Sequence, residues 1–323
     1  MTAPASSGSP GPWPFRLSLA TAIAAVPLVL FGGTVTTLRA GMAESGWIHP
    51  DGYFLWAYPV GKRFGSIGVF VEHHHRELGT LVGLLAIAAA IAAWRKESRP
   101  LARMLPAFAL LAVCLQGLIG GLRVLKNSPD LAFLHGALAQ AVFAFLAATA
   151  LYLSPRWRSV SPTACKTAAG LQRTANITVA LVFAQVTLGA WTRHSEADIA
   201  LALHVILALG VLGAIVVFGR KLRAAVEQGE RGQVDRRLLL GVKWRLHMLV
   251  GIQVLLGCLA AFWKYEVSGG PQAPVSMGEA IFATAHVAVG ALLLAQSVAA
   301  AMWSRRVVCT QDVTQVAGLE AAR

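Results

Sequence analysis

Residues 78–94 read LGTLVGLLAIAAAIAAW, 17 consecutive residues without a charged side chain. A transmembrane α-helix needs roughly 20 mostly apolar residues to cross about 30 Å of hydrocarbon. Only 13% of the 323 residues are charged, against roughly 25% in soluble proteins, so water is the wrong solvent for most of this surface. Seven further uncharged stretches of comparable length lie at residues 17–38, 104–122, 131–155, 174–192, 199–219, 246–263 and 280–304. The sequence therefore predicts an all-α polytopic membrane protein with eight transmembrane helices.

The basic side chains are distributed unevenly over this topology. With the N-terminus placed in the cytoplasm, 20 of the 28 Lys and Arg residues fall in cytoplasmic segments and the other 8 on the outer side. Cytoplasmic loops of membrane proteins carry such an excess of positive charge, so we expect both termini in the cytoplasm. Topology and membrane lipid then account for the net charge of +13, and no nucleic-acid partner is expected.

The chain divides into two predicted halves of four helices each. Residues 1–14 are rich in Pro, Gly and Ser and are predicted to be a disordered tail. Residues 15–155 form the N-terminal half, residues 156–173 a polar basic linker, residues 174–304 the C-terminal half, and residues 305–323 a cytoplasmic tail. We expect the halves to be two pseudo-symmetric four-helix bundles.

A short repeat supports duplication of a four-helix unit. In three predicted helices a Gln is followed four residues later, on the same helix face, by a Gly: Gln116 and Gly120, Gln185 and Gly189, Gln253 and Gly257. The first predicted helix has Gly32 but carries Leu28 in place of the Gln. Helix packing is the favoured interpretation, because a small residue permits close approach and a Gln supplies an interhelical hydrogen bond. A direct contact with a cofactor is the alternative.

Every second predicted helix carries a histidine near its outer end: His75, His135, His204 and His286. Ionisable side chains at membrane depth are costly and mark functional sites. Haem iron can take two axial imidazoles, and facing helices of a bundle can present them. Two histidines per half therefore predict one haem per half, although an interhelical hydrogen bond is the simpler interpretation of any single one. Zinc is disfavoured, because its sites usually combine closely spaced Cys, His and carboxylate ligands.

The segment around His75 holds further polar residues. Glu72, His75 and Arg76 are three and four residues apart and share a helix face. Glu72 could exchange protons during an oxidation, or simply favour a helix N-terminus. Arg76 could bind a haem propionate, or pair with Glu72. No role follows for the other outer histidines, His49, His73, His74 and His194. His194 is close enough to the outer end of its helix to touch a propionate, but an exposed loop residue is the favoured interpretation.

The predicted outer loop, residues 39–71, is rich in aromatic side chains. It contains Trp47, Tyr53, Phe54, Trp56, Tyr58 and Phe64. Aromatic residues at this level are typical of a membrane interface. Six of them in one loop also suit a lid over a flat apolar ligand.

In these segments the chain resembles the haem A synthase family, membrane enzymes that convert haem O to haem A. The resemblance covers roughly residues 17–303 and is carried by residues 32–37, 45–47, 72–76, 115–121, 135 and 284–294. It implies that His75 and His135 flank the substrate haem O, with Glu72 essential to the oxidation. It also implies that His204 and His286 ligate a b-type haem that relays electrons.

The resemblance further implies the reaction and its setting. One methyl group of haem O would become a formyl group by successive hydroxylations, and the haem A would serve haem-copper terminal oxidases. A haem O synthase and an electron donor are the implied partners. The implied location is a bacterial cytoplasmic (inner) membrane, with the haem sites toward the outer, periplasmic face.

Departures from the family pattern concern mainly the C-terminal half. Some members carry a cysteine pair in an outer loop of each half, and no such pair is present here. His204 is not followed by Arg, and the loop at residues 193–198 is short. A dihaem b-type cytochrome that exchanges electrons with quinone is the alternative function, but such a relay needs no carboxylate like Glu72. A haem transporter is disfavoured, because all four histidines lie toward one face. Homo-oligomerisation, the electron donor and the oxygen source stay open.

Overall fold

The computed structural model describes residues 11–165, 167–195, 198–228, 235–270 and 272–309. Within these residues, eight helices are long and apolar enough to cross a membrane. They are α1 (Trp13–Thr37), α3 (Ile67–Lys96), α4 (Pro100–Lys126), α5 (Pro129–Leu153), α7 (Ala168–His194), α8 (Asp198–Gln228), α9 (Arg236–Phe262) and α10 (Met277–Val307). The predicted all-α fold with eight membrane-spanning helices is thereby confirmed.

Short elements connect these helices. Between α1 and α3 lie the 3-10 turns η1 (Pro50–Gly52) and η2 (Leu55–Ala57) and the helix α2 (Val60–Arg63). Between α5 and α7 lie α6 (Pro155–Ser159) and the strand β1 (Thr163–Ala164), which pairs in parallel with β2 (Val308–Cys309) after α10. Helix α9 continues into a π-helical turn, η3 (Trp263–Val267).

Several predicted boundaries shift. Helix α1 begins at Trp13, inside the predicted tail of residues 1–14, and residues 1–10 of that tail lie outside the described part of the chain. The predicted linker ends early, because α7 already begins at Ala168. Most of the predicted C-terminal tail, residues 310–323, also lies outside the described residues.

Helix α3 begins earlier than the sequence predicts. Its N-cap is Ser66, whose hydroxyl accepts a hydrogen bond from the backbone N–H of Val69 at 3.2 Å. The outer loop, a name kept below for residues 38–66, is therefore shorter than the predicted 39–71. Charged side chains can occupy the first turns of α3 because this loop supplies them with polar partners.

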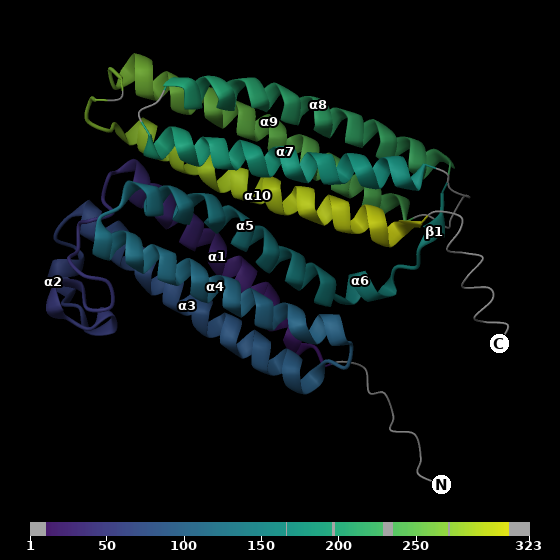
Figure 1. The fold of residues 1–323 in the computed structure, drawn as a ribbon, viewed down its shortest axis with the longest axis horizontal. Coiled ribbons are helices and arrows are strands. Elements are labelled where there is room, and N and C mark those ends of the chain that lie inside the picture. Colours follow the sequence, from purple (N-terminus) through teal and green to yellow (C-terminus); the bar gives the residue numbers. More distant parts are fainter. Residues whose placement is uncertain (1–10, 166, 196–197, 229–234, 271, 310–323) are drawn as a thin grey trace, which may run out of the picture.

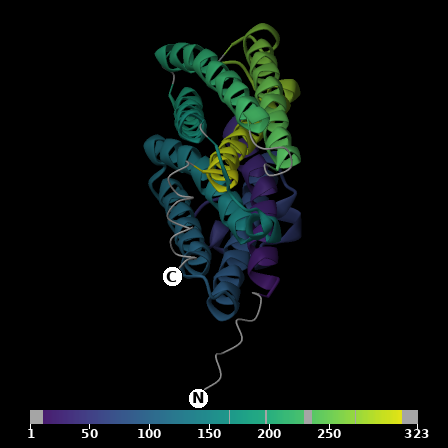
Figure 2. The same ribbon diagram turned by 90° about the vertical axis from the view of Figure 1, so that its right-hand side faces the viewer.

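The long helices form two rings of four. Helices α1, α3, α4 and α5 pack each against the next, and so do α7, α8, α9 and α10. Figure 2 shows the N-terminal bundle in purple and blue beside the C-terminal bundle in green and yellow. Helix α10 packs against both α1 and α5, and α5 also packs against α7. These four helices form the seam between the bundles.

The bundles present corresponding ends to the same side of the molecule. The first residues of α3, α5, α8 and α10 all lie at the end where α2 and the outer loop are found (Figure 1). The start of α1 and the end of α10 lie at the opposite end. The four candidate histidines thus belong to the half of each helix nearest the outer loop.

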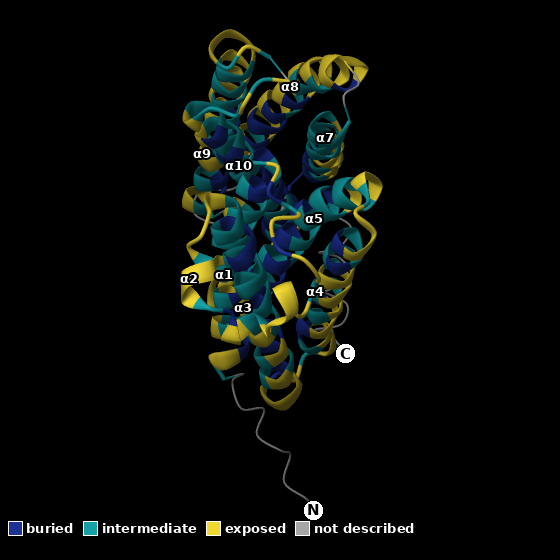
Figure 3. Cartoon of the chain, turned by 90° about the vertical axis from the view of Figure 1, so that its left-hand side faces the viewer, coloured by how far each residue is buried: buried dark blue, intermediate teal, exposed yellow. Residues whose placement is uncertain are grey.

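Buried residues lie where the helices face one another, whereas residues on the outward faces are mostly exposed (Figure 3). The buried face of α3 includes Ala86, Ala89 and Ala93, small residues that let neighbouring helices approach closely. Large apolar residues such as Ile206 and Leu209 of α8 are 65% and 71% exposed. This pattern suits a surface that faces lipid rather than water.

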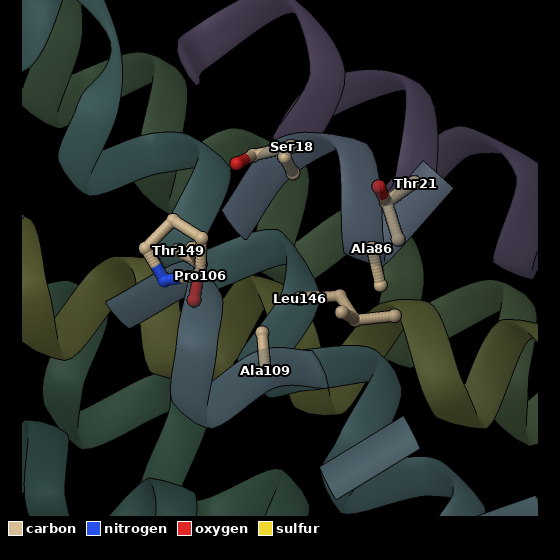
Figure 4. A pocket seen from close by; sticks show the side chains of 8 residues that line it. Ser18, Thr21, Ala86, Pro106, Ala109, Leu146 and Thr149 are labelled. Atoms are coloured by element: carbon tan, nitrogen blue, oxygen red, sulfur yellow. The ribbon is translucent and has the colours of Figure 1, made fainter. Parts of the chain in front are cut away.

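A small cavity of about 10 Å³ lies inside the N-terminal bundle, away from the outer loop. Figure 4 shows Ser18 and Thr21 of α1 and Thr149 of α5 among its lining side chains. The hydroxyls of Ser18 and Thr149 have no hydrogen-bond partner in the protein. The volume is at the lower limit of what can hold one water molecule.

Candidate functional sites

Two histidine pairs face each other inside the bundles. In the N-terminal half, the rings of His75 from α3 and His135 from α5 have centroids 6.4 Å apart at an interplanar angle of 87°. In the C-terminal half, the rings of His204 from α8 and His286 from α10 are 6.2 Å apart at 70°. The structure thus brings together both histidine pairs that the sequence singles out.

The spacing of each pair suits a metal ion between two imidazoles. A metal bonded at about 2.0 Å to one nitrogen of each ring holds the ring centroids roughly 6 Å apart. Among the described residues, no group of three or more His, Cys, Asp or Glu side chains is placed to hold a metal ion. Haem iron needs only two protein ligands, because the porphyrin supplies the other four. The donor set therefore fits haem.

Each of the four imidazoles is held by the long helix that precedes its own. Nδ1 lies 3.1 Å from the backbone carbonyl oxygen of Leu28 in His75, 3.2 Å from that of Gln185 in His204 and 3.1 Å from that of Gln253 in His286. The ring of His135 is hydrogen-bonded to the backbone of Gln116, and its Nδ1 also lies 3.0 Å from Nε2 of the Gln116 side chain. A ring that donates its Nδ1–H to a carbonyl keeps the lone pair of Nε2 for a metal.

A glycine one helical turn beyond each carbonyl makes room for the ring. A Cβ atom added at Gly32, Gly120, Gly189 or Gly257 would stand 2.8, 2.7, 3.0 or 3.0 Å from Cε1 of His75, His135, His204 or His286, respectively. We call each carbonyl together with its glycine an imidazole cradle. The Gln–Gly repeat, interpreted from the sequence as helix packing, therefore also positions the candidate ligands.

Three of the four cradles add a side-chain amide. Nε2 of Gln116 donates to the backbone carbonyl of His135 at 2.6 Å, and Nε2 of Gln185 donates to that of His204 at 2.8 Å. Nε2 of Gln253 lies 3.2 Å from Nε2 of His286, the ring nitrogen that would bind a metal. The cradle of His75 has Leu28 at the corresponding position.

Glu72 is buried beneath the outer loop and uses both carboxylate oxygens. Oε2 accepts the backbone N–H of Glu44 at 3.0 Å, and Oε1 accepts a hydrogen bond from Nη2 of Arg76 at 2.8 Å. Arg76 also donates to the backbone carbonyls of Gly46 at 2.9 Å and Trp47 at 3.2 Å. Of the two partners predicted for Arg76, the structure contains the pairing with Glu72, while the propionate contact stays a prediction.

Glu44 and His73 form a buried pair that the sequence does not predict. Oε1 of Glu44 lies 2.8 Å from Nδ1 of His73, and Nε2 of His73 lies 3.4 Å from Oε1 of Glu77. Burial raises the pKa of Glu44 to about 7, although the nearby guanidinium of Arg76 opposes that shift. The two members of the pair are 29 residues apart. No spacing rule links residues of a loop and a helix at that separation.

Asp51 fastens the outer loop from within. Its carboxylate accepts hydrogen bonds from the hydroxyl of Tyr58 at 2.7 Å and from the hydroxyl of Ser45 at 2.8 Å. These hydrogen bonds lower the pKa of Asp51. The ring of Tyr58 in turn stacks on His73, with centroids 4.7 Å apart. The loop is therefore a folded structure docked on α3.

The aromatic residues of the outer loop play two different parts. Trp47 packs so closely on Gly121 of α4 that a Cβ there would overlap its ring, and Tyr58 is buried. Phe54, Trp56 and Phe64 are more than half exposed. The first two side chains cover the bundle as a lid would, whereas the other three suit a membrane interface.

The last two residues of α7 reach across the seam. Nη2 of Arg193 donates to the carbonyl of Gly33 at 3.0 Å and to the hydroxyl of Thr37 at 2.7 Å, both in α1. His194 packs on α5, since a Cβ at Gly136 would stand 3.5 Å from its Nε2. The prediction that His194 is an exposed loop residue is wrong, because α7 extends to include it.

The fold and these sites define a class of polytopic helical membrane proteins with two four-helix bundles, each holding a histidine pair near the same end. Residues 62–202 match the family described as cytochrome oxidase assembly protein, COX15-CtaA. Over these residues the match confirms the family resemblance recognised from the sequence. The match contains Glu72, His75 and His135 and ends before His204 and His286. Among curated proteins, none matches the chain.

Proposed function

We propose that the protein is a haem A synthase, an oxidoreductase that converts one methyl group of haem O to a formyl group. The observation that carries the proposal is the buried carboxylate of Glu72, three residues before His75, within the segment that matches the cytochrome oxidase assembly family. The His75–His135 pair has the spacing for axial ligation and lies in the bundle that the outer loop covers. His204 and His286 would hold a b-type haem.

Bound haem would supply the redox-active iron, with haem O as the substrate of the N-terminal pair. Converting a methyl to a formyl group is a four-electron oxidation that removes protons from the carbon. A carboxylate near the reacting group can accept such protons. Glu72 is held through both oxygens by the backbone of Glu44 and by Arg76, so its position is defined before substrate arrives. The outer loop would exclude water from this end of the bundle.

The orientation in the membrane belongs to the same proposal. The helix ends nearest the four histidines lie on the side of the outer loop, and the start of α1 and the end of α10 lie on the other (Figure 1). The excess of basic residues favours the second side as cytoplasmic. Both haem sites would then face the periplasm of a bacterial inner membrane, where a haem O synthase and an electron donor serve the enzyme from within the same membrane.

One observation favours the alternative of a dihaem b-type cytochrome. The two histidine pairs have nearly the same ring separation, 6.4 and 6.2 Å, as two permanent electron-transfer haems would require. Extraction of haem from cells that co-express a haem O synthase separates the two functions. A synthase yields haem A by mass spectrometry, and recovery of haem O alone from the wild-type protein would contradict the proposed reaction.

The role of Glu72 has a matched test. Glu72→Gln keeps the volume of the side chain but removes the proton acceptor, so we expect haem A formation to fall about 100-fold or more. Glu97→Gln is the control, because Glu97 is also buried but pairs with Arg99 at 2.9 Å at the opposite end of α3. If both variants form haem A at the wild-type level, Glu72 has no role in the oxidation.

A further inference from the structure

The four imidazole cradles differ at a single position. His135, His204 and His286 each have a Gln whose amide contacts the histidine, whereas the cradle of His75 has Leu28. We propose that Leu28 is a positioning residue that leaves His75 the least firmly held imidazole, so that haem exchanges at the N-terminal pair and stays at the C-terminal pair. This inference rests on the proposed function only in assuming that both pairs bind haem.

The amides lock helices together at the depth of the ligands. Gln116 fixes α4 to α5 through the carbonyl of His135, and Gln185 fixes α7 to α8 through that of His204. Hydrogen bonds in a low-dielectric interior are strong, and breaking one leaves a buried polar group unpaired. Moving either histidine away from haem therefore requires the loss of such a bond.

No amide lock of this kind joins α1 to α3 at His75. Among the described contacts, the one hydrogen bond of its ring goes to the carbonyl of Leu28 at 3.1 Å. The Leu28 side chain instead points toward Gly79, one turn beyond His75, where an added Cβ would be 4.0 Å from Cδ1 of the leucine. An apolar contact is non-directional and resists the sliding of two helices less than a hydrogen bond does.

The outer loop takes over the task of holding this end of α3. Arg76 donates to the loop carbonyls of Gly46 and Trp47, and His73 contacts Glu44. These contacts are polar and lie at the end of the bundle. Contacts made by a loop can break and re-form more easily than a hydrogen bond between buried helices. A site that releases its ligand needs such contacts.

The C-terminal pair has the opposite construction. Gln185 holds His204 through its backbone carbonyl as Gln116 holds His135, and Gln253 places an amide beside the ring of His286, where the cradle of His75 has Leu28. Both cradles of this pair therefore carry an amide. The difference between the pairs therefore follows from their supports and not from the ring geometry, which is nearly equal.

The test follows haem release, not turnover. The full-length protein in detergent is loaded with ordinary haem b at both pairs and mixed with excess apomyoglobin, which captures released haem. We expect a fast and a slow phase of transfer. His135→Ala should abolish the fast phase and His204→Ala the slow one, which assigns each phase to a pair.

Leu28→Gln should add the missing amide, since Gly79 leaves space beside it. We expect the fast phase to slow by roughly fivefold, the ratio for one net hydrogen bond, and the control Leu28→Met to leave it unchanged. Gln185→Leu should quicken the slow phase by a similar factor. If Leu28→Gln does not fold, judged by thermal unfolding of the haem-free protein, Gln185→Leu and Gln116→Leu decide the question.

Two results would overturn the inference: a fast phase that Leu28→Gln leaves unchanged, or phases that both Gln→Leu variants leave unchanged. Because the probe is haem b and no oxidation occurs, the outcome is independent of haem A formation. Retained release kinetics without any haem A in the extraction experiment would count against the proposed reaction alone.

Discussion

At the scale of single residues, four glycines decide where the imidazoles can stand. A Cβ atom would stand closer than 3.0 Å to the ring at Gly32 and Gly120, and at 3.0 Å, a tight contact, at Gly189 and Gly257. The same helix presents its backbone carbonyl to the ring. A ligand held by backbone atoms varies little with neighbouring side chains, so the cradle can recur in four places with different surroundings.

Gly120→Ala should disturb the N-terminal site. The new Cβ would stand 2.7 Å from Cε1 of His135 and push the ring away from the carbonyl of Gln116. We expect the affinity of this site for haem to fall about tenfold, equivalent to about 1.4 kcal/mol. The measurement is the titration of haem into the purified protein, followed by absorbance.

The control for this variant lies one turn earlier in the same helix. A Cβ added at Gly117 meets nothing within 4 Å, so Gly117→Ala should bind haem as the wild type does. If both variants lose haem, α4 does not tolerate alanine at either position, and the loss at Gly120 would not be evidence for the imidazole cradle.

The residue types at the sites were predictable, but several of their partners were not. The four histidines stood out because they recur at one depth in alternate helices, and a polar residue in such a helix needs an explanation. Glu44 gave no signal, since an acidic residue in an outer loop is ordinary. Only the folded loop buries it against His73.

At the scale of elements, the outer loop and α3 depend on each other. The loop satisfies the charged residues that begin α3, and those residues hold the loop. This mutual dependence explains why α3 could not be delimited from hydropathy alone. Uncharged residues begin at Leu78, yet the helix begins at Ile67 because Glu72 and Arg76 find partners in the loop.

Docking of the loop should weaken with rising pH through Glu44. Its pKa in the folded protein is about 7, above the usual 4.5, because burial disfavours the charged form. Because its pKa is higher in the folded than in the unfolded protein, Glu44 contributes to the stability of the folded state. This contribution is fully present below about pH 4.5 and is lost as the pH rises through about 7. We therefore expect the thermal unfolding midpoint of the protein in detergent to decrease as the pH is raised from 5 to 8.

Glu44→Gln should flatten this pH profile, because the neutral amide does not ionise. Glu97→Gln should keep the slope of the wild type. Burial raises the pKa of Glu97, but the hydrogen bonds and charge of Arg99 together outweigh it, so the pKa is lowered and Glu97 is charged throughout this range. A profile of equal slope in wild type and Glu44→Gln would show that the ionisation of Glu44 is not what loosens the loop.

At the scale of the whole molecule, the two bundles are joined close to both histidine pairs. Gly32 contacts His75, and the next residue, Gly33, contacts Thr284, two residues before His286. Duplication could be inferred from the repeat, but the seam could not, since a repeat does not say which helices of two copies meet. Arg193 occupies this seam and donates to Gly33 and Thr37.

Arg193→Gln should therefore affect both halves at once. A fixed positive charge stabilises the reduced iron of a nearby haem, so its removal should lower the midpoint potentials of the haem-loaded protein. We expect a shift of some tens of millivolts, where about 59 mV is a tenfold change in a one-electron equilibrium.

Arg193→Lys keeps the charge and should shift the potentials less. Lys126→Gln removes an exposed cation at the end of α4 and is the control for net charge. If the midpoint potentials change equally in Arg193→Gln and Lys126→Gln, the change would come from the net charge of the protein. The seam would then join the two bundles without coupling their haem sites.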